Sequence, residues 1–589
     1  MNADAPNLNS LWGRLFIEEL VRIGLGYFCL PPGSRCAPLT TAAAAHPGAT
    51  CIHHFDERGA AFHALGYARA TGRPAVLITT SGTAVANTWP AVVEASMDRV
   101  PMILVTADRP PELHDTGANQ TIDQVKLFGP YVRWQIDLPC PDTQINPEVI
   151  LTGVDQAVYR AQRSPQGPVH INCMYREPLA PVSSGEDYTS YLSGLESWLG
   201  GTKPFTEYML PGASPMDQPV QQLTSTLNKI ERGLVVVGSL GDPEQSRSVR
   251  KLIQKLSWPT LPDITSGLRL GNYQSPMIPH FDAALASPRF ADENQPQAVL
   301  HLGGRLISKR LLDYLERCRP CPYILVNDHP LRHDPFHGVT LRIEAEVSCF
   351  CESLLPHLKT KPKKESPWLS RWREGSDCVT RTLEAFTMEN GGLSEPLVAW
   401  LVSQLIRPDD GLFLAASMPV RDADTYGAVN GSQVQVACNR GTNGIDGTLA
   451  TATGFAQGLK RPVTLLIGDI ALLHDLNSLY LLRSIEIPVI VVVLNNNGGG
   501  IFSFLPIAQF PDHFERYFGT PHNLTFEGAA GMFGLAYAHP RTKEAFIDSY
   551  RGAHQSGQST VIEITTERKE NYDLHVRLLE TITSNLNRT

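Results

Sequence analysis

The stretch that decides the fold is Val463-Thr464-Leu465-Leu466-Ile467-Gly468-Asp469, then a helical segment, then the apolar run 487–494 and Asn495-Asn496-Asn497-Gly498-Gly499-Gly500. Two short apolar runs joined by a helix predict a βαβ unit with parallel strands. Because parallel strands end at one edge of a sheet, Asp469 and Asn496 are expected there together. Carboxylate and amide oxygens suit a hard cation such as Mg²⁺, which in turn implies a phosphorylated ligand. The glycine run leaves backbone groups free to approach a phosphate.

Each half of this pattern also has a plain structural explanation. Asp469 alone is a helix cap, and the Asn/Gly run alone is a turn. Together, at this spacing, they favour the metal site. Neither GxGxxG nor GxxxxGK[ST] occurs, which argues against a dinucleotide-binding fold and a P-loop nucleotidase.

Outward from this unit, the chain reads as three α/β blocks. Short apolar runs alternate with glycine-bearing loops and helical segments, which predicts parallel sheets covered by helices on both faces. The expected strands are 27–31, 75–80 and 101–106 in the first block, 233–238, 298–302 and 323–326 in the second, and 411–415, 463–467 and 488–494 in the third. The first and third blocks look alike in architecture. We expect linkers at 186–218, which is rich in Ser, Gly, Pro and Tyr, and at 359–384, which contains the charged stretch 359–365.

Composition excludes several classes of protein. The chain has 589 residues, 50 Lys and Arg against 59 Asp and Glu, and a net charge of −9, so a nucleic-acid partner is not expected. The longest apolar run is too short to span a membrane, and residues 1–10 contain no signal or transit pattern. We therefore expect a cytoplasmic protein without a membrane partner.

The metal pattern resembles that of the thiamine diphosphate enzymes, Gly-Asp-Gly followed some two dozen residues later by Asn-Asn. This chain departs from it at Gly468-Asp469-Ile470. The resemblance implies thiamine diphosphate and Mg²⁺, with Mn²⁺ as an alternative ion. It also implies three doubly wound parallel-sheet domains: a pyrimidine-binding domain (1–185), a central domain (219–358) and a diphosphate-binding domain (385–589).

Glu57 is the candidate catalytic acid. It follows His53-His54-Phe55-Asp56, in a segment that leads from a strand into a helix of small residues at 60–71. Thiamine diphosphate enzymes need a carboxyl group that hydrogen-bonds the aminopyrimidine ring and so promotes loss of the thiazolium C2 proton. A first-turn acid favoured by the helix dipole explains Glu57 equally well on local sequence. Its role depends on the neighbouring motifs.

Those motifs are similar to one branch of the family, the decarboxylase-type carboligases of menaquinone and phylloquinone biosynthesis. They are Leu30-Pro31-Pro32-Gly33-Ser34-Arg35, Thr79 to Asn87, Thr106 to Glu112, Gly117-Ala118-Asn119-Gln120, Ser308-Lys309-Arg310-Leu311-Leu312, Ala416 to Arg421, Asn439 to Gly447 and Gly500-Ile501-Phe502-Ser503. The resemblance implies decarboxylation of 2-oxoglutarate and 1,4-addition of the resulting succinic semialdehyde carbanion to isochorismate.

The resemblance also assigns residues to roles. Glu57, Gln120 and Arg35 would be catalytic. Cofactor binding would fall to Glu57, Ser417, Gly444, Ile445, Gly468, Asp469, Ile470, Asn496, Gly498, Ile501 and Phe502, and the metal to Asp469, Asn496 and Gly498. Substrate binding would fall to Ser34, Arg35, Arg109, Gln120, Lys309, Arg310, Ser417, Arg421 and Arg440. Both substrates are dianions, and arginine suits bidentate capture of carboxylates.

Two alternatives stay open at this point. One is another enzyme of the same superfamily, such as an acetolactate synthase or a 2-oxoacid decarboxylase, which would not need so many cationic residues. The other is a non-catalytic protein that keeps the fold, against which the presence of Glu57, Asp469 and Asn496 argues. The family resemblance further implies a homo-oligomer, a dimer or a dimer of dimers, with Glu57 and Asp469 of one site supplied by different chains.

Overall fold

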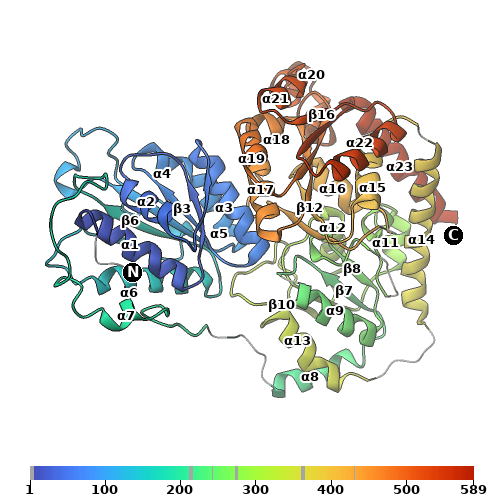
Figure 1. Ribbon diagram of the computed structural model, residues 1–589. Helices are drawn as coiled ribbons and strands as arrows, with labels where there is room; N and C mark the ends of the chain where they lie inside the picture. Colours follow the sequence, from blue (N-terminus) through green and yellow to red (C-terminus); the bar gives the residue numbers. More distant parts are fainter. Residues whose placement is uncertain are drawn as a thin grey trace. The chain divides into compact units, whose positions relative to one another are not determined.

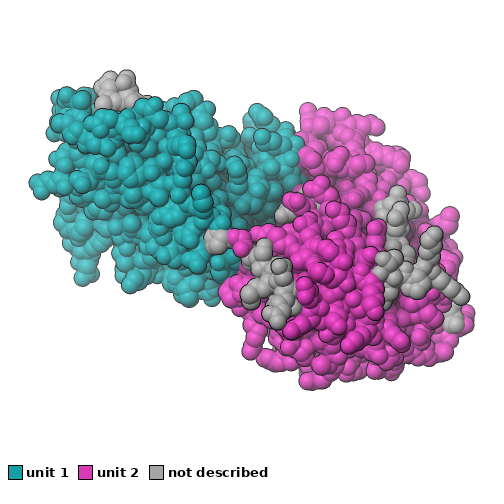
Figure 2. Space-filling model, turned by 90° about the horizontal axis from the view of Figure 1, so that it is seen from below, with its two compact units in different colours: residues 1–211, 439–460, 474–487 teal, residues 212–438, 461–473, 488–589 magenta. Residues whose placement is uncertain are grey.

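The computed structural model describes residues 5–210, 212, 217–241, 243–271, 276–359, 365–389, 391–429 and 431–588 (Figure 1). The chain divides into two compact units, which Figure 2 colours separately. Unit 1 comprises residues 1–211, 439–460 and 474–487, and unit 2 comprises 212–438, 461–473 and 488–589. Of the helices in the described ranges, none combines the length and apolar character needed to cross a membrane.

Unit 1 contains one six-stranded parallel sheet. Its strand order is β2-β1-β3-β4-β6-β5. The strands are β1 (Tyr27–Leu30), β2 (Thr50–His53), β3 (Ala75–Thr79), β4 (Met102–Asp108), β5 (Gln135–Leu138) and β6 (Pro168–Met174). Successive side chains of a strand face opposite sides, so Val76 and Ile78 enter one apolar layer while Ala75 and Leu77 enter the other. The three strands predicted in this block are confirmed.

Helices cover both faces of this sheet. The first layer is formed by α1 (Leu8–Arg22), α2 (Ala37–Ala45) and α6 (Glu148–Gln162). The second is formed by α3 (Glu57–Thr71), α5 (Trp89–Asp98), α17 (Thr448–Leu459) and α19 (Leu479–Ser484). Figure 1 shows α1 and α6 on one side of the sheet and α3 and α5 on the other. Two short helices, α4 (Thr83–Asn87) and α7 (Glu196–Gly200), complete the unit.

Helices α3 and α17 pack closely because glycines lie where they cross. A β-carbon at Gly66 would lie 1.9 Å from the carbonyl oxygen of Thr451, and one at Gly454 would lie 1.9 Å from that of His63. Any larger residue at either position would push the helices apart. The segment 448–459 is therefore an integral part of unit 1.

Unit 2 contains two parallel sheets. The middle sheet has the order β11-β10-β9-β7-β8, from β7 (Gly233–Val237), β8 (Thr260–Pro262), β9 (Ala298–Leu302), β10 (Tyr323–Asn327) and β11 (Leu341–Glu344). Helices α8 (Asp217–Leu227), α9 (Pro243–Leu256) and α13 (Val347–Leu354) pack on one face. Helices α12 (Lys309–Cys318) and α14 (Pro367–Glu389) pack on the other.

The third sheet has the order β13-β12-β14-β15-β17-β16. Its strands are β12 (Gly411–Leu414), β13 (Gln435–Cys438), β14 (Val463–Gly468), β15 (Val489–Asn495), β16 (Ala536–Ala538) and β17 (Thr560–Thr565). If the strands of each sheet are numbered from one along the chain, the first and third sheets have the same strand order, 2-1-3-4-6-5. The predicted likeness of the first and third blocks is thereby confirmed, as is the fold class of three parallel-sheet α/β domains.

The other helices of this unit surround the third sheet and join it to the middle one. They are α10 (Phe281–Ala284), α11 (Pro288–Glu293), α15 (Glu395–Leu405), α16 (Met418–Tyr426), α18 (Asp469–His474), α20 (Pro511–Phe514), α21 (Glu527–Met532), α22 (Lys543–Ser556) and α23 (Arg568–Arg588). A shared core of α15, α16, α22 and α23 covers one face of the sheet.

The two predicted linkers contain packed structure. In the first, Tyr188, Leu192, Leu195 and Trp198 are buried in the core of unit 1, and residues 211 and 213–216 lie outside the described residues. In the second, residues 360–364 of the charged stretch lie outside the described residues, but 367–389 form α14. Its Trp368 and Trp372 pack into the middle domain. The interpretation of 367–384 as linker was wrong because Pro367 starts a helix, where proline is well suited.

The segment between β14 and β15 is also less regular than expected. The sequence predicts a single helical segment between these strands, running through residues 474–479. The structure ends α18 at His474, forms a single 3₁₀ turn at Leu476–Ser478, and starts α19 at Leu479. The carboxylate of Asp475 causes the break, because it accepts hydrogen bonds from the Ala450 backbone N–H at 2.9 Å and from the Ser478 hydroxyl at 2.7 Å.

Candidate active site

In open parallel sheets, ligands bind beyond the carboxyl ends of the strands where the strand order reverses. In the third sheet that point lies between β12 and β14, which are followed by Ser417 and Asp469. In the first sheet it lies between β1 and β3, which are followed by Ser34 and Ser81. Both switch points therefore carry residues that the sequence singled out.

Asp469 lies at the end of β14 and is 2% exposed. Its Oδ1 accepts a hydrogen bond from the Ile470 backbone N–H at 2.7 Å. Its Oδ2 accepts one from the Gly498 N–H at 2.8 Å and lies 3.0 Å from Nε2 of His522. Burial raises the pKa of Asp469, and the hydrogen bond from His522 counteracts the rise. The predicted meeting of Asp469 with the glycine run is thus present.

Asn496 lies one residue beyond β15 and is 7% exposed. Its Nδ2 donates a 2.9 Å hydrogen bond to Oε1 of Glu395. Its Oδ1 is buried and, within the described ranges, accepts no hydrogen bond. An acceptor left without a donor at this place suits a cation as its partner.

Glycines are required at two positions around these side chains. At Gly498, where φ is +141°, a β-carbon would lie 1.9 Å from the Gly519 carbonyl oxygen. A β-carbon at Gly500 would lie 2.5 Å from Nδ2 of Asn496. In contrast, a β-carbon at Gly468 would meet no described atom within 4 Å, so the space above this residue is open. The Gly498 carbonyl accepts a 2.9 Å bond from the Gly500 N–H and keeps a second lone pair for a metal.

The donor set therefore fits a hard divalent cation. It comprises the Asp469 carboxylate, the Asn496 amide oxygen and the Gly498 carbonyl, which are all oxygen ligands as Mg²⁺ prefers. Among the described residues, no group of three or more His, Cys, Asp or Glu side chains is placed to hold a metal. The candidate centre differs from such clusters because it combines one carboxylate with an amide oxygen and a backbone oxygen.

The other candidates of unit 2 lie next to the strand ends. Ser417 has φ +71° and precedes α16, and its carbonyl accepts a hydrogen bond from the guanidinium of Arg421. Ile470 follows Asp469 in α18, while Ile501 and Phe502 lie in a 3₁₀ turn at residues 500–504. All three are partly buried and form apolar walls near the glycine run.

Glu57 is the first residue of α3. Asp56 caps this helix by accepting the Arg58 N–H at 2.9 Å, and Asn477 donates to the same carboxylate at 2.5 Å. Nδ2 of Asn87 lies 3.4 Å from Oε2 of Glu57, which leaves the other oxygen of the carboxylate for a ligand. The helix start therefore holds Glu57 partly exposed at the edge of the first sheet.

Arg35 and Arg109 lie close enough to interact electrostatically. Burial, and then the positive charge of Arg35, lower the pKa of Arg109. The Arg35 guanidinium donates to the Tyr175 carbonyl at 2.9 Å and lies 3.5 Å from Glu177, while its Nε is buried with no hydrogen-bond partner among the described residues. Two neighbouring cations at a strand edge, with a donor unsatisfied, are suited to an anionic ligand.

Ser81 joins Arg109 to Gln120. Its hydroxyl contacts the Arg109 guanidinium and lies 3.0 Å from the Gln120 carbonyl oxygen. Gln120 has φ +58° and an exposed side chain, and Ser34 is also exposed in the loop after β1. The predicted residues Ser34, Arg35, Arg109 and Gln120 thus gather at the carboxyl edge of the first sheet.

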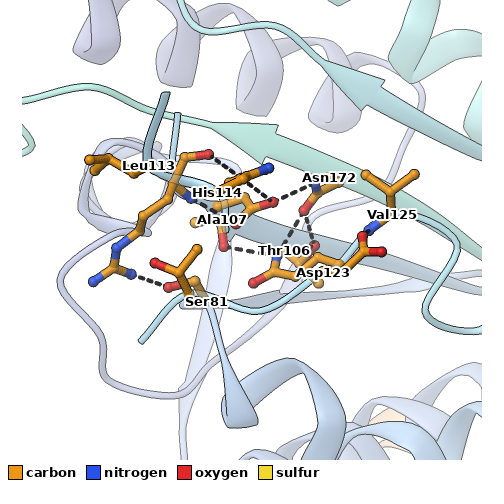
Figure 3. Close-up of polar contacts among 12 residues, drawn as sticks. Ser81, Thr106, Ala107, Leu113, His114, Asp123, Val125 and Asn172 are labelled. Carbon is orange, nitrogen blue, oxygen red and sulfur yellow. Dashed lines mark hydrogen bonds and ion pairs between the residues drawn. The ribbon is translucent and has the colours of Figure 1, made fainter. Parts of the chain in front are cut away.

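A buried polar network supports this edge from behind (Figure 3). Asn172 donates to Asp108 at 2.9 Å and accepts from Thr106 at 2.9 Å. Gln124, fully buried, donates to Asn172 at 2.8 Å and accepts the Gly82 N–H at 2.9 Å. Gln124 therefore fixes the turn that places Ser81 beside Arg109.

Arg440, Gly444 and Ile445 belong to a loop that forms part of unit 1. The buried carboxylate of Glu94 on α5 holds the loop, because it accepts the backbone N–H groups of Gly441 and Thr442, both at 2.7 Å. Burial raises the pKa of Glu94. These three candidates are positioned by a residue that the sequence did not indicate.

Lys309 and Arg310 open helix α12 in the middle domain. Lys309 pairs with Asp313 of the same helix at 3.1 Å, and its side chain is 86% exposed. Arg310 pairs with Asp282 at 2.5 Å. Within the described part of the chain, Lys309 and Arg310 form ion pairs with these two acids, neither of which is a predicted site residue. Their substrate role stays a prediction.

Sequence reasoning missed several supporting residues. His522 contacts Asp469 from a segment more than 50 positions along the chain, and Glu395 contacts Asn496 from about 100 positions before it. Glu94 lies 347 positions along the chain from Gly441, which it holds, and Gln124 lies 48 positions from Asn172. The local sequence offers one signal, an acid at the start of a helix in Ser394-Glu395-Pro396. This signal does not indicate which residue the acid contacts.

Family models match the chain in three consecutive parts. Residues 12–127 match the N-terminal TPP binding domain of thiamine pyrophosphate enzymes, 189–414 match the middle domain, and 426–564 match the C-terminal TPP binding domain. A solved structure, described as a thiamin diphosphate-dependent enzyme from Mycobacterium smegmatis, has a TM-score of 0.69 over 94% of this chain and 99% of its own. At 16% identity it supports the fold alone.

Relatives of known name match nearly the whole chain. Several are named 2-succinyl-5-enolpyruvyl-6-hydroxy-3-cyclohexene-1-carboxylate synthase. The one from Rubrobacter xylanophilus is 52% identical to this chain, over 98% of this chain and 99% of the relative. The one from Salinibacter ruber is 47% identical over 98% and 97%, and the one from Prosthecochloris aestuarii is 44% identical over 99% and 98%. By this similarity over the full length, together with the three matched domains, the chain belongs to the 2-succinyl-5-enolpyruvyl-6-hydroxy-3-cyclohexene-1-carboxylate synthase family of thiamine pyrophosphate enzymes.

Proposed function

We propose that this chain is a carboligase that uses thiamine diphosphate and Mg²⁺ to decarboxylate 2-oxoglutarate and to add the remaining four-carbon unit to isochorismate, giving the product named in its relatives. The observation that carries the cofactor assignment is the Oδ1 atom of Asn496, which is buried near Asp469 and has no hydrogen-bond partner in the described part of the chain. The names of the relatives support this reaction and do not favour an acetolactate synthase or a non-catalytic protein.

The third sheet supplies the metal ligands. Asp469, Asn496 and the Gly498 carbonyl would hold Mg²⁺, whose positive charge would favour binding of the coenzyme's diphosphate. The open space above Gly468 and the apolar side chains of Ile470, Ile501 and Phe502 would line the place of the coenzyme. The coenzyme, when bound, supplies the carbon nucleophile and the electron sink for the loss of CO₂.

Glu57 supplies the carboxyl group that the aminopyrimidine ring needs. Its Oε2 is within 3.4 Å of Asn87, and the other oxygen is available to hydrogen-bond a ring nitrogen and hold a proton there. Ile445, on the loop held by Glu94, would support the bent shape of the coenzyme. These roles come from the family resemblance and agree with partly buried positions of both residues.

The cationic edge of the first sheet would bind the carboxylates of the substrates. Arg35 and Arg109 are mutually close, and the contact with Ser81 orients the Arg109 guanidinium. Gln120 lies against the same turn and would orient the second substrate. Arg421, Arg440, Ser417, Ser34, Lys309 and Arg310 complete the predicted set.

The assembly, the location and the domain boundaries are further parts of the proposal. We infer a homo-oligomer, at least a dimer, in which Glu57 and Asp469 of one site come from different chains, and a cytoplasmic enzyme. We also keep the division into pyrimidine-binding, central and diphosphate-binding domains, with the linkers corrected as described above.

The test is turnover with defined substrates. The purified protein is incubated with thiamine diphosphate, Mg²⁺ and 2-oxoglutarate, with and without isochorismate, while CO₂ and the coupled product are measured. We expect coupled product in the complete mixture only. CO₂ release without coupling would favour a different enzyme of the superfamily. A folded protein that releases no CO₂ would refute the proposal.

A further inference from the structure

Glu395 is a buried acid beside the proposed metal ligands, and the chemistry above does not use it. It is the first residue of α15 and 1% exposed. Its Oε1 accepts hydrogen bonds from Nδ2 of Asn496 at 2.9 Å and from the Thr566 hydroxyl at 3.2 Å. Burying a carboxylate is costly, and here it lies within electrostatic reach of a second carboxylate, Asp469. The presence of this buried acid next to a second carboxylate therefore needs an explanation.

An asparagine side chain can turn either its oxygen or its NH₂ group towards a neighbour, and only the oxygen can bind a cation. The Glu395 oxygen accepts the Nδ2–H group of Asn496 and so leaves Oδ1 pointing away, buried and without a donor among the described residues. We propose that Glu395 is a positioning residue that orients the amide of Asn496 so that Oδ1 faces the metal. This inference rests on the metal site of the proposed function.

Both members of the pair are held from further sides. The amide of Asn496 packs against Gly500, where a β-carbon would lie only 2.5 Å from Nδ2, so only glycine leaves room for it there. The Thr566 N–H donates to the Asn495 carbonyl at 2.9 Å, which continues the pairing of β17 with β15 and places the Thr566 hydroxyl on Glu395. The acid is therefore held by the sheet that also carries Asn496. Loss of such a partner of a metal ligand typically weakens metal binding about 10–100-fold.

The neighbouring residue pair provides a matched control. Asn495 precedes Asn496, and its Nδ2 donates to Oε1 of Glu563 at 2.6 Å. Glu563 is fully buried and also accepts from Phe526 and Tyr537. It is thus an acid of the same type on an adjacent amide, but Asn495 is not a predicted metal ligand. A change at Glu563 reports what loss of a buried acid does to the fold alone.

The experiment measures metal binding directly in the full-length protein. Mn²⁺ is titrated in the presence of thiamine diphosphate, and the free ion is followed by electron paramagnetic resonance. We expect Glu395→Met, which removes the acceptor, to raise the Mn²⁺ dissociation constant at least tenfold. Glu395→Gln keeps an acceptor oxygen and should stay within about threefold of the wild type, as should Glu563→Gln.

A reversal of the pair tests orientation without removing polar groups. Asn496→Asp puts two buried carboxylates side by side and should weaken Mn²⁺ binding. Adding Glu395→Gln restores one donor and one acceptor, while both ends of residue 496 are now oxygens. We expect the double variant to recover most of the lost affinity. This result is available even if Glu395→Met does not fold.

The outcomes separate two failures. If the wild type takes up no Mn²⁺ with the coenzyme present, the metal site itself is refuted and the role of Glu395 with it. If the wild type binds Mn²⁺ but folded Glu395→Met binds it equally well, or the double variant recovers nothing, the positioning role alone is refuted. A Glu563→Gln variant that loses as much affinity as Glu395→Met would likewise reduce Glu395 to a structural acid.

Discussion

Nε2 of His522 lies 3.0 Å from Oδ2 of Asp469, while Nδ1 of the same ring accepts a 3.0 Å hydrogen bond from the Leu524 N–H. Because Nδ1 is the acceptor, the ring proton is on Nε2 and points at the carboxylate. The Asn497 amide oxygen accepts the N–H of His522 at 2.9 Å, so the Asn/Gly run holds the histidine in place. The segment around residue 522 thus fixes the orientation of the Asp469 carboxylate, the proposed metal ligand.

We predict that His522→Ala weakens Mg²⁺ binding about tenfold or more, because the Asp469 carboxylate loses a donor that orients it. His522→Gln, which can still donate, should retain more of the affinity. The measurement is the Mg²⁺ concentration for half-maximal coenzyme binding. As a control, His539→Ala removes a histidine that bonds Thr565 instead, and should leave this value unchanged. Equal values for His522→Ala and the wild type would show that the contact is incidental.

Glu57→Gln should bind thiamine diphosphate with near-normal affinity and lose turnover by a factor of about 10²–10⁴, the usual contribution of a general acid–base group. The matched control is Glu148→Gln, because Glu148 is likewise the first residue of a 15-residue helix. If a first-turn acid merely stabilises its helix, both variants should behave alike. Steady-state rates and calorimetric coenzyme titrations distinguish the two cases.

Arg109→Gln should lower kcat/KM about 10–100-fold for the dianionic substrates, since a hydrogen bond to a charged group contributes roughly 1.5–3 kcal/mol. Coenzyme affinity should not change. Arg176 is a fitting control, because its side chain is 54% exposed and pairs with Glu112 on the surface. Arg176→Gln should have little effect. An Arg109 variant with unchanged kcat/KM would remove this residue from the substrate site.

His63 makes unit 1 sensitive to acid. Burial lowers the pKa of His63 to about 3, and the ring lies 2.7 Å from the Tyr27 hydroxyl and 2.8 Å from the Thr453 hydroxyl. An unfolded histidine titrates near 6.5, so between that pH and about 3 the unfolded chain binds one more proton than the folded chain. The contribution of His63 to the free energy of unfolding is therefore fully present above pH 6.5. It decreases as the pH is lowered, by about 2 kcal/mol at pH 5.

The measurement is the denaturation midpoint at pH 7.5 and at pH 5 for the wild type and for His63→Gln. Glutamine can accept from Tyr27 and donate to Thr453, but it does not titrate. We expect the variant to lose less stability between the two pH values than the wild type. A variant with the same loss would assign the acid sensitivity to other buried histidines, such as His170, whose pKa burial lowers to about 4.

Much of the fold follows from the sequence because parallel strands leave a strong local signal. The run 463–469 and the run 487–500 place Asp469 and Asn496 at one sheet edge without further information, and the structure agrees. The likeness of the first and third sheets follows from the same alternation of strands and helices. The packed helix at 367–389 was hidden because its charges and Pro367 resemble those of a linker, while its tryptophans contact the middle domain only in the folded chain.

The supporting residues of the site could not be predicted for a physical reason. His522, Glu395 and Glu94 act through hydrogen bonds to groups far away in the sequence, and their own neighbours show no periodic pattern that names the partner. Lys309 is the opposite case, a residue that the sequence indicates but the structure does not place among the other candidates. Its motif resembles the family pattern, while its side chain is exposed and paired with Asp313. Local sequence therefore indicates candidate ligands more readily than the residues that orient them.

The most direct measurement is a calorimetric titration of the full-length protein with thiamine diphosphate, once with Mg²⁺ and once with excess chelator. We predict saturable binding with Mg²⁺, and a loss of about 100-fold or more in affinity with chelator or in Asp469→Ala, because in the proposed site Asp469 and Asn496 would hold the coenzyme through the ion. Equal uptake in chelator, or no uptake with Mg²⁺ present, would contradict a metal-held coenzyme at the end of β14 and β15.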